Sequence, residues 1–171
     1  MNARVTRLLC AALAAGWLLG ASAAEALQFK PLLAKDAHAL LNGPRAHVLI
    51  VEIWSLDCSY CHENTARIVQ WRRAHKLPVD VIMISMDSPD QADTLARALA
   101  PLARDPKVGL AHVAQYVNAE AMPERLRAAL DPGWQGETPR TLFIGPDGAR
   151  RASSGLLTPQ ALDAAFAPIL H

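Results

Sequence analysis

Two continuous apolar runs stand out in the chain, and both are rich in β-branched residues. They cover residues 47–54 (HVLIVEIW) and 79–86 (VDVIMISM). An apolar run of this length is typical of a strand that is buried on both faces of a sheet. We therefore predict a buried strand at each of the two positions.

Helical patterns lie on either side of the first of these strands. Residues 33–41 predict a short helix, which the dipeptide Gly43-Pro44 ends. Residues 58–76 predict a longer helix, because they contain no glycine or proline. Cations gather near the end of that segment, where they suit the helix dipole.

A third predicted helix follows the second strand. Ser88 precedes Pro89, which fits the first helical position, and Gln91 stands where a capping box requires it. We therefore expect the Ser88 side chain to cap this helix. Its core face consists of Leu95, Leu99 and Leu102.

The C-terminal part of the chain has a less regular pattern. Residues 113–117 are compatible with a strand or with a helix. Residues 146–148 (PDG) mark a turn between two strand-like runs, which predicts a hairpin. The other predicted elements are a helix over 122–130, a strand over 141–144, and a helix from Thr158-Pro159 with Leu162, Phe166 and Ile169 on one face.

The order of these elements predicts an α/β fold. Because strands alternate with helices and a hairpin and a helix close the chain, we expect helices on both faces of a mixed sheet. The length of 171 residues, with 51% hydrophobic and 19% charged residues, suits one globular domain and excludes a disordered chain. The net charge of +1 argues against nucleic acid as a partner.

The N-terminal 23 residues have the pattern of a secretory signal peptide. Two arginines provide the charged start, residues 8–19 are apolar, and residues 21–23 (ASA) form a cleavage site. Residues 24–26 (AEA) are a second candidate, so we predict cleavage after residue 23 or 26. An uncleaved membrane anchor is the alternative, although the apolar run is shorter than the roughly 20 residues that cross a bilayer.

Cleavage leaves a single domain over residues 27–171. With cleavage after residue 23, the loss of Arg4 and Arg7 changes the net charge from +1 to −1. Two of the three cysteines stay in the mature chain. We therefore place the protein in the periplasm, an oxidising compartment in which a disulfide between them persists.

The two remaining cysteines, Cys58 and Cys61, form a C-x-x-C motif between a predicted strand and a predicted helix. A cysteine in the first turn of a helix has its thiolate stabilised by free backbone N–H groups and the dipole. Cys61 lies one turn further on the same face, where it can resolve a mixed disulfide that Cys58 forms. The charge of Asp57 opposes the effect on Cys58, and His62 supports it when protonated.

Residues 52–61 (EIWSLDCSYC) resemble the active-site stretch of the thioredoxin superfamily. In that family a buried acid stands six residues before the first cysteine and a tryptophan four before it, the positions of Glu52 and Trp54. Residues 137–148 (ETPRTLFIGPDG) resemble the proline loop and hairpin of exported TlpA-like and cytochrome c maturation-type members. Residues 105–137 are longer than the minimal fold requires, and we expect them to add a specificity surface.

The resemblance implies a thioredoxin-like three-layer α/β/α sandwich with a mixed central sheet. It also implies the roles of the site residues. Cys58 is the nucleophile, Cys61 the resolving thiol, and Glu52 a buried carboxylate of raised pKa that takes the Cys61 proton. The remaining implied roles concern substrate: a cis Pro139 against the disulfide, a Thr138 backbone that pairs with an extended peptide, and an apolar rim formed by Trp54 and Tyr60.

By the same resemblance, the protein is a thiol–disulfide oxidoreductase of the periplasm, and we favour a reductase. Disulfide oxidation or isomerisation on the same fold is the alternative, because Ser59-Tyr60 lacks the proline that the family often has between its cysteines. Expected partners are thiols and disulfides of exported proteins, with a membrane electron donor. We expect a monomer that needs no cofactor beyond the Cys58–Cys61 disulfide.

Other functions fit the same residues less well. Cys58, Cys61 and His62 satisfy the C-x-x-C-H pattern of covalent haem attachment, but the motif follows a buried strand in an α/β pattern. The same three residues offer ligands for Cu(I) or Zn²⁺, without an evident fourth. A non-catalytic adaptor would not need both cysteines. The other histidines show no metal-ligand spacing: His38, His47, His75, His112 and His171.

Overall fold

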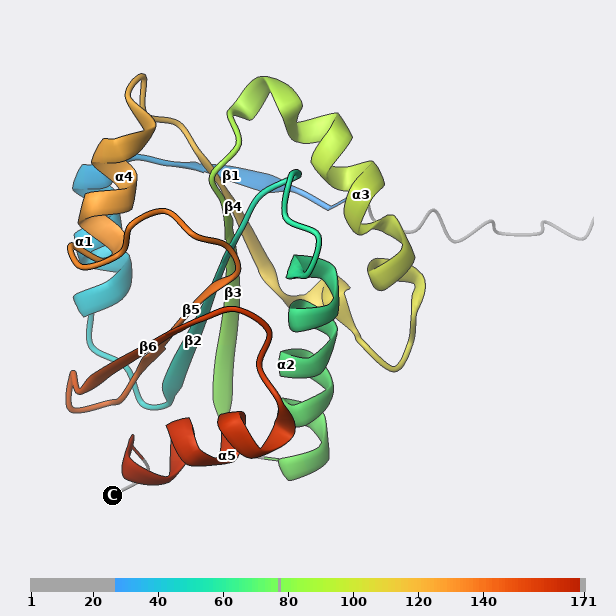
Figure 1. Cartoon of the computed structure of the whole chain (residues 1–171), viewed down its shortest axis with the longest axis vertical. Coiled ribbons are helices and arrows are strands. Elements are labelled where there is room, and N and C mark those ends of the chain that lie inside the picture. Colours follow the sequence, from blue (N-terminus) through green and yellow to red (C-terminus); the bar gives the residue numbers. More distant parts are fainter. Residues whose placement is uncertain (1–26, 77, 170–171) are drawn as a thin grey trace, which may run out of the picture.

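The computed structural model describes residues 27–76 and 78–169, which build a six-stranded sheet in the order β1-β4-β3-β2-β5-β6 (Figure 1). The two apolar runs form the central strands β2 (Val48–Trp54) and β3 (Val79–Ser85), which pair in parallel. The predicted mixed sheet is confirmed, because β5 pairs with β2 antiparallel. The outer strands are β1 (Phe29–Leu32), β4 (Ala114–Asn118), β5 (Arg140–Ile144) and β6 (Arg150–Ser154).

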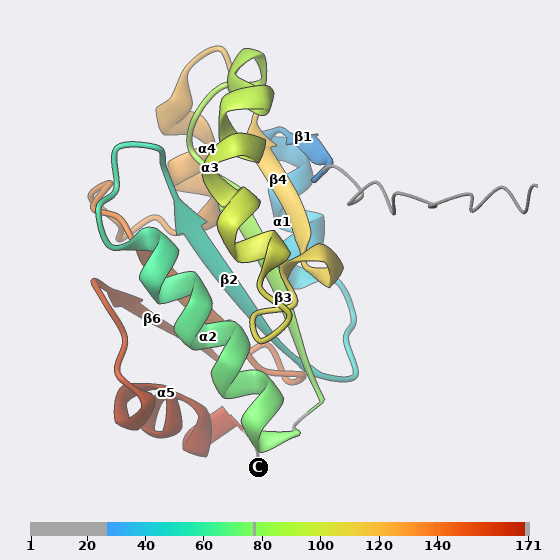
Figure 2. The same ribbon diagram turned by 90° about the vertical axis from the view of Figure 1, so that its right-hand side faces the viewer.

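Helices cover both faces of the sheet, as predicted (Figures 1 and 2). One face carries α2, α3 and α5, and the other carries α1 and α4. Successive side chains of a strand point to opposite faces. Strand β2 therefore contributes side chains to the hydrophobic cores on both faces, and all seven of its residues are buried. The helix bounds are α1 (Ala34–Asn42), α2 (Cys61–His75), α3 (Ala92–Arg104), α4 (Pro123–Leu130) and α5 (Pro159–Phe166).

The ambiguous stretch around residues 113–117 is a strand. Strand β4 pairs in parallel with β3 on one side and with β1 on the other. The pattern did not predict β1, a four-residue strand that contains Pro31. Proline lacks an N–H for the ladder and is tolerated at a sheet edge, which is where β1 lies.

Two predicted helix starts differ from the observed ones. The helix expected over 58–76 begins at Cys61, three residues later. The capping box at Ser88 does not form, because its hydroxyl donates to Asp90 and a short 3₁₀ turn over Pro89–Gln91 precedes α3. Thr158 does cap α5, and its hydroxyl accepts from the Ala161 N–H at 3.1 Å.

The predicted signal peptide and both of its predicted cleavage sites lie outside the residues that the structure describes. None of the helices within residues 27–169 that the structure describes combines the length and the apolar character that crossing a bilayer requires.

Candidate functional site

Cys58 and Cys61 form a disulfide where β2 leads into α2, with Cα atoms 5.5 Å apart. The two cysteines differ in exposure, since Cys58 is half-buried and Cys61 is 0% exposed. The expectation that Cys58 stands in the first helical turn is wrong. The backbone first makes a turn in which the Cys58 N–H donates to the Ser55 carbonyl at 3.3 Å, and helical bonding starts with Asn64 N–H to Tyr60 O at 2.9 Å.

Glu52 is a fully buried carboxyl group in the middle of the central strand. The Nδ2 of Asn64 donates to both of its oxygens, each at 3.0 Å, and the Thr141 hydroxyl donates to Oε2 at 2.9 Å. Burial raises the pKa of Glu52 to about 8, and the hydrogen bonds from Asn64 and Thr141 lower it in part. Burial therefore outweighs the two donors, as expected when no cation compensates for lost hydration.

The strand register explains how Glu52 reaches the cysteine helix. Glu52 lies opposite Thr141 on β5 and opposite Met83 on β3. Alternation places its side chain on the sheet face that α2 covers. Asn64 is three residues after Cys61, so both side chains lie on the same face of α2.

The sequence analysis overlooked Asn64 and Thr141. A signal for Asn64 exists, because it precedes Ile68 by four residues and Trp71 by seven, on the apolar stripe of the helix. A polar residue on a buried stripe requires a buried partner. Nothing in the local pattern pairs Thr141 with Glu52, since they are far apart in the chain and meet only through strand pairing.

Asp87 is another overlooked residue that shapes the loop before the disulfide. Its Oδ2 accepts from the Leu56 N–H at 3.0 Å and from the Ser85 hydroxyl at 2.7 Å. The carboxylate therefore ties the loop that follows β2 to the end of β3.

The two residues of the expected apolar rim differ in exposure. Tyr60 is 60% exposed beside the disulfide. The rim position predicted for Trp54 is wrong, because its side chain is fully buried, with its ring centroid 5.9 Å from that of His62. Burial lowers the pKa of His62, so this ring is neutral at neutral pH and adds no positive charge beside Cys58.

The proline loop lies next to the loop that carries the disulfide. The Thr138–Pro139 peptide bond is cis, Pro139 is buried, and Thr138 is half-buried. The Thr138 hydroxyl lies 3.4 Å from that of Ser55, which joins the two loops. Both segments therefore border the same part of the surface.

An open hollow of about 270 Å³ adjoins this meeting point. Its walls include Ser55 and Thr138 from the two loops and Pro123 and Arg127 from α4. Met122, immediately before α4, is 60% exposed. The segment 105–137 therefore contributes surface beside the loop that leads to the disulfide.

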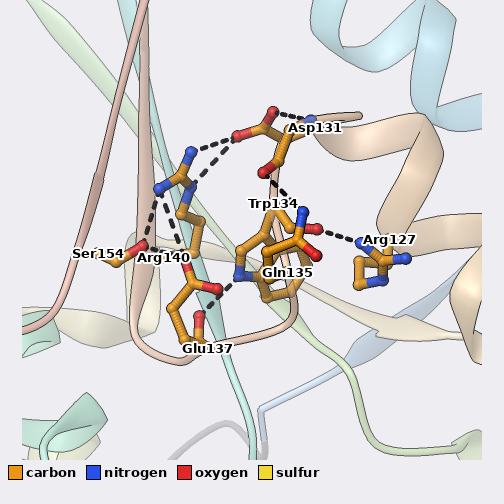
Figure 3. Close-up of polar contacts among 8 residues, drawn as sticks. Arg127, Asp131, Trp134, Gln135, Glu137, Arg140 and Ser154 are labelled. Carbon is orange, nitrogen blue, oxygen red and sulfur yellow. Dashed lines mark hydrogen bonds and ion pairs between the residues drawn. The ribbon is translucent and has the colours of Figure 1, made fainter.

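A polar network fixes the loop that leads to Thr138 (Figure 3). The Arg140 guanidinium donates to Asp131 Oδ2 at 2.6 and 3.2 Å and to the Ser154 hydroxyl at 2.7 Å. Arg127 donates to the Trp134 carbonyl, and the Trp134 indole N–H donates to the Glu137 carbonyl at 2.7 Å. The loop is thus anchored on α4 and on β6.

Metal ligands do not cluster in the part of the chain that the structure describes. Within it, no group of three or more His, Cys, Asp or Glu side chains could hold a metal ion. Cys58 and Cys61 are bonded to each other.

Comparison with known proteins supports the fold. No protein-family model and no curated protein matches the sequence. Among solved structures, a thioredoxin-related protein from Neisseria meningitidis serogroup B is 21% identical, with a TM-score of 0.52 over 76% of this chain and 90% of its own. A thiol:disulfide interchange protein from Chlorobium tepidum is 19% identical, with a TM-score of 0.51 over 78% and 84%.

A third similar structure is a thiol–disulfide isomerase from Corynebacterium glutamicum. It is 15% identical, with a TM-score of 0.54 over 86% of this chain and 97% of its own. At these identities the similarity establishes the fold. The predicted thioredoxin-like α/β/α sandwich is confirmed, with a cysteine pair of C-x-x-C spacing at the end of its central strand.

Proposed function

We propose that the chain is a periplasmic thiol–disulfide oxidoreductase that reduces disulfides in exported proteins. The observation that carries the proposal is the unequal exposure of the two disulfide-bonded cysteines. Cys58 is half-buried and within reach of another protein, whereas Cys61 is enclosed. An exposed nucleophile with a shielded resolving thiol is the arrangement that two-step disulfide exchange requires.

The reaction starts from the reduced pair. The Cys58 thiolate attacks one sulfur of a substrate disulfide, and the other substrate sulfur leaves as a thiolate that takes up a proton. The Cys61 thiol then loses its proton, its sulfur attacks Cys58 Sγ, and the second substrate thiolate leaves and is protonated. Two electrons thus pass to the substrate, and the Cys58–Cys61 disulfide remains.

Glu52 is the proton acceptor for Cys61 in this scheme, directly or through water. Because the pKa of Glu52 is raised to about 8, the carboxyl group keeps its proton at neutral pH in the oxidised protein. When a dithiol donor reduces the disulfide by attack on Cys58, Cys61 leaves as a thiolate and takes that proton. The group therefore serves as acid in one half of the cycle and as base in the other.

Substrate binding falls to the surface around Cys58. An extended peptide pairs with the Thr138 backbone above Pro139, and Tyr60 gives it an apolar contact. The hollow between the proline loop and α4 receives residues next to the substrate cysteine.

Residues 1–23 direct export, and residues 27–171 form the mature domain. A membrane dithiol is the electron donor.

The direction of electron flow is tested by the reduction potential of the Cys58–Cys61 pair. The mature chain from Ala24 is equilibrated with glutathione or dithiothreitol, and the Cys58→Ser variant is the control. A value near roughly −270 mV supports a reductase. A value near roughly −120 mV supports the alternative that the protein is a disulfide oxidase. If the pair does not change between its disulfide and dithiol forms, the proposal is overturned.

A further inference from the structure

Asn64 and Thr141 each make a second hydrogen bond that favours the orientation in which they donate to Glu52. The Oδ1 of Asn64 accepts from the Leu157 backbone N–H at 2.7 Å. The amide orientation is therefore fixed, and Nδ2 must face the Glu52 carboxyl group, where it lies 3.0 Å from both oxygens.

The Thr141 hydroxyl is oriented in the same way by a second contact. Its Oγ1 accepts from Asn64 Nδ2 at 3.2 Å, so its own hydrogen is directed to Glu52 Oε2 at 2.9 Å. A hydroxyl could otherwise turn and accept from a protonated carboxyl group. Here one lone pair accepts from Asn64, which favours the orientation in which the hydroxyl hydrogen faces Glu52, and both side chains act on the ionised carboxyl group as donors.

Resting on the proposed role of Glu52, we propose that Asn64 and Thr141 are positioning residues that orient this carboxyl group and stabilise its ionised form. They thereby determine the pH at which Glu52 can accept the Cys61 proton. Donors directed at a buried carboxylate favour its charged state, and they counter the burial that favours the neutral state.

Neutral groups, rather than charged ones, stabilise the ionised form of Glu52. Near the start of α2, Cys61 is bonded to Cys58 and does not titrate in the oxidised protein, and His62 lies against Trp54 with its pKa lowered by burial. The charged residues Glu63 and Arg67 pair with each other at 2.6 Å on the exposed side of α2. Asp163 of α5 accepts from Trp71 and lies 3.4 Å from His75.

The neighbouring strands add no ion pair either. On β3 the residue opposite Glu52 is Met83, and Asp80 lies near the other end of the strand, where it pairs with His47. On β5, Arg140 points to the Asp131 network. None of the ion pairs within the described residues includes Glu52.

The test uses variants that remove or keep the threonine hydroxyl group. Thr141→Val removes the donor, Thr141→Ser keeps it, and Thr65→Val is the matched control, since Thr65 is buried on α2 and its hydroxyl has no hydrogen-bond partner in the structure. The readout is the carbon-13 NMR titration of the Glu52 carboxyl group in the oxidised protein, assigned by its loss in Glu52→Gln.

Loss of a donor to a charged group predicts that Thr141→Val raises the midpoint of the Glu52 titration by about one pH unit, a ten-fold change in its ionisation constant. Thr141→Ser and Thr65→Val leave the midpoint within about 0.3 pH units of the wild type. The inference is overturned if Thr141→Val does not move the midpoint, or if Thr65→Val moves it equally.

A second readout separates this inference from the proposed function. The rate of substrate-disulfide reduction is followed against pH in the same variants. If Thr141→Val moves both the rate profile and the titration, both ideas stand. If Glu52→Gln removes the limb of the rate profile but Thr141→Val moves neither curve, Glu52 keeps its role and the inference fails. If Glu52→Gln leaves the rate profile unchanged, the assignment of Glu52 as proton acceptor fails.

Discussion

Two polar networks meet at neighbouring residues of β5, and they are built on different principles. Thr141 lies opposite Glu52 on β2 and belongs to a network that is fully buried. Arg140 lies opposite Ser154 on β6 and belongs to a partly exposed network of ion pairs (Figure 3). Strand alternation sends the two side chains to opposite faces of the sheet.

The comparison shows that burial determines whether a hydrogen-bond network alters the acidity of a side chain or only holds a segment in place. In the buried network, neutral donors surround one carboxyl group, and the balance with burial alters its acidity. In the partly exposed network, Arg140 and Asp131 are both charged and still in reach of water, with side chains 16% and 18% exposed. The first network sets the acidity of a carboxyl group, and the second holds a loop.

The largest expected effect is the loss of protein stability when the buried network is broken. Asn64→Ala leaves the Leu157 N–H unpaired and removes two bonds to Glu52, so we expect it to lower the free energy of unfolding by about 3 kcal/mol. Urea denaturation of the oxidised protein measures this. The exposed Asn42→Ala is the matched variant, and an equal loss in both would contradict the comparison.

The next effect is a pH dependence of stability that comes from Glu52. Its pKa is raised to about 8 in the folded protein, whereas the unfolded chain releases this proton near the usual value of 4.5. The contribution is therefore fully present below pH 4.5 and is lost as the pH rises toward 8. We expect wild-type stability to fall by roughly 1.5 kcal/mol between pH 6.5 and 8.

Glu52→Gln is the control for this dependence, because the amide does not titrate. Urea denaturation at the two pH values should give a flat response for the variant. A wild-type slope that persists in the variant would assign the dependence to another group.

A smaller effect is expected in the partly exposed network. Asp131→Asn removes the ion pair to Arg140 and should lower the free energy of unfolding by about 1 kcal/mol. Salt screens partly exposed pairs, so the loss should shrink in 1 M NaCl. Asp147→Asn in the β5–β6 turn is the matched control, and a loss independent of salt would count against an electrostatic origin.

The smallest effect concerns an exposed pair on the same helix as Asn64. Glu63 and Arg67 are four residues apart and 2.6 Å from each other. Glu63→Gln should change the free energy of unfolding by only about 0.3 kcal/mol. A change as large as that of Asn64→Ala would show that position on α2, rather than burial, governs the cost.

Much of the fold was predictable because its signals are local. The apolar runs give β2 and β3, and Thr158-Pro159 gives the start of α5. The C-x-x-C motif marked Cys58 as a candidate, and the resemblance to the thioredoxin superfamily marked Glu52. Ser88 shows the limit of such signals, since its hydroxyl was engaged by Asp90 instead of the helix backbone.

Other features depended on long-range contacts. Residues 113–117 and β1 became strands because neighbouring strands offered hydrogen-bond partners. The family resemblance assigned Trp54 to the apolar rim. Its position on a strand that is buried on both faces removed it from the surface.

By itself, the sequence determined the spacing of the cysteine pair and the position of the central strands, because the C-x-x-C motif and the apolar runs are properties of the chain. Only the tertiary structure decided what surrounds them. It left Cys58 partly exposed and Cys61 enclosed, and it placed Asn64 and Thr141 on Glu52. The physical reason is that burial and hydrogen-bond partners arise when distant segments pack, and these surroundings set the acidity of a buried carboxyl group.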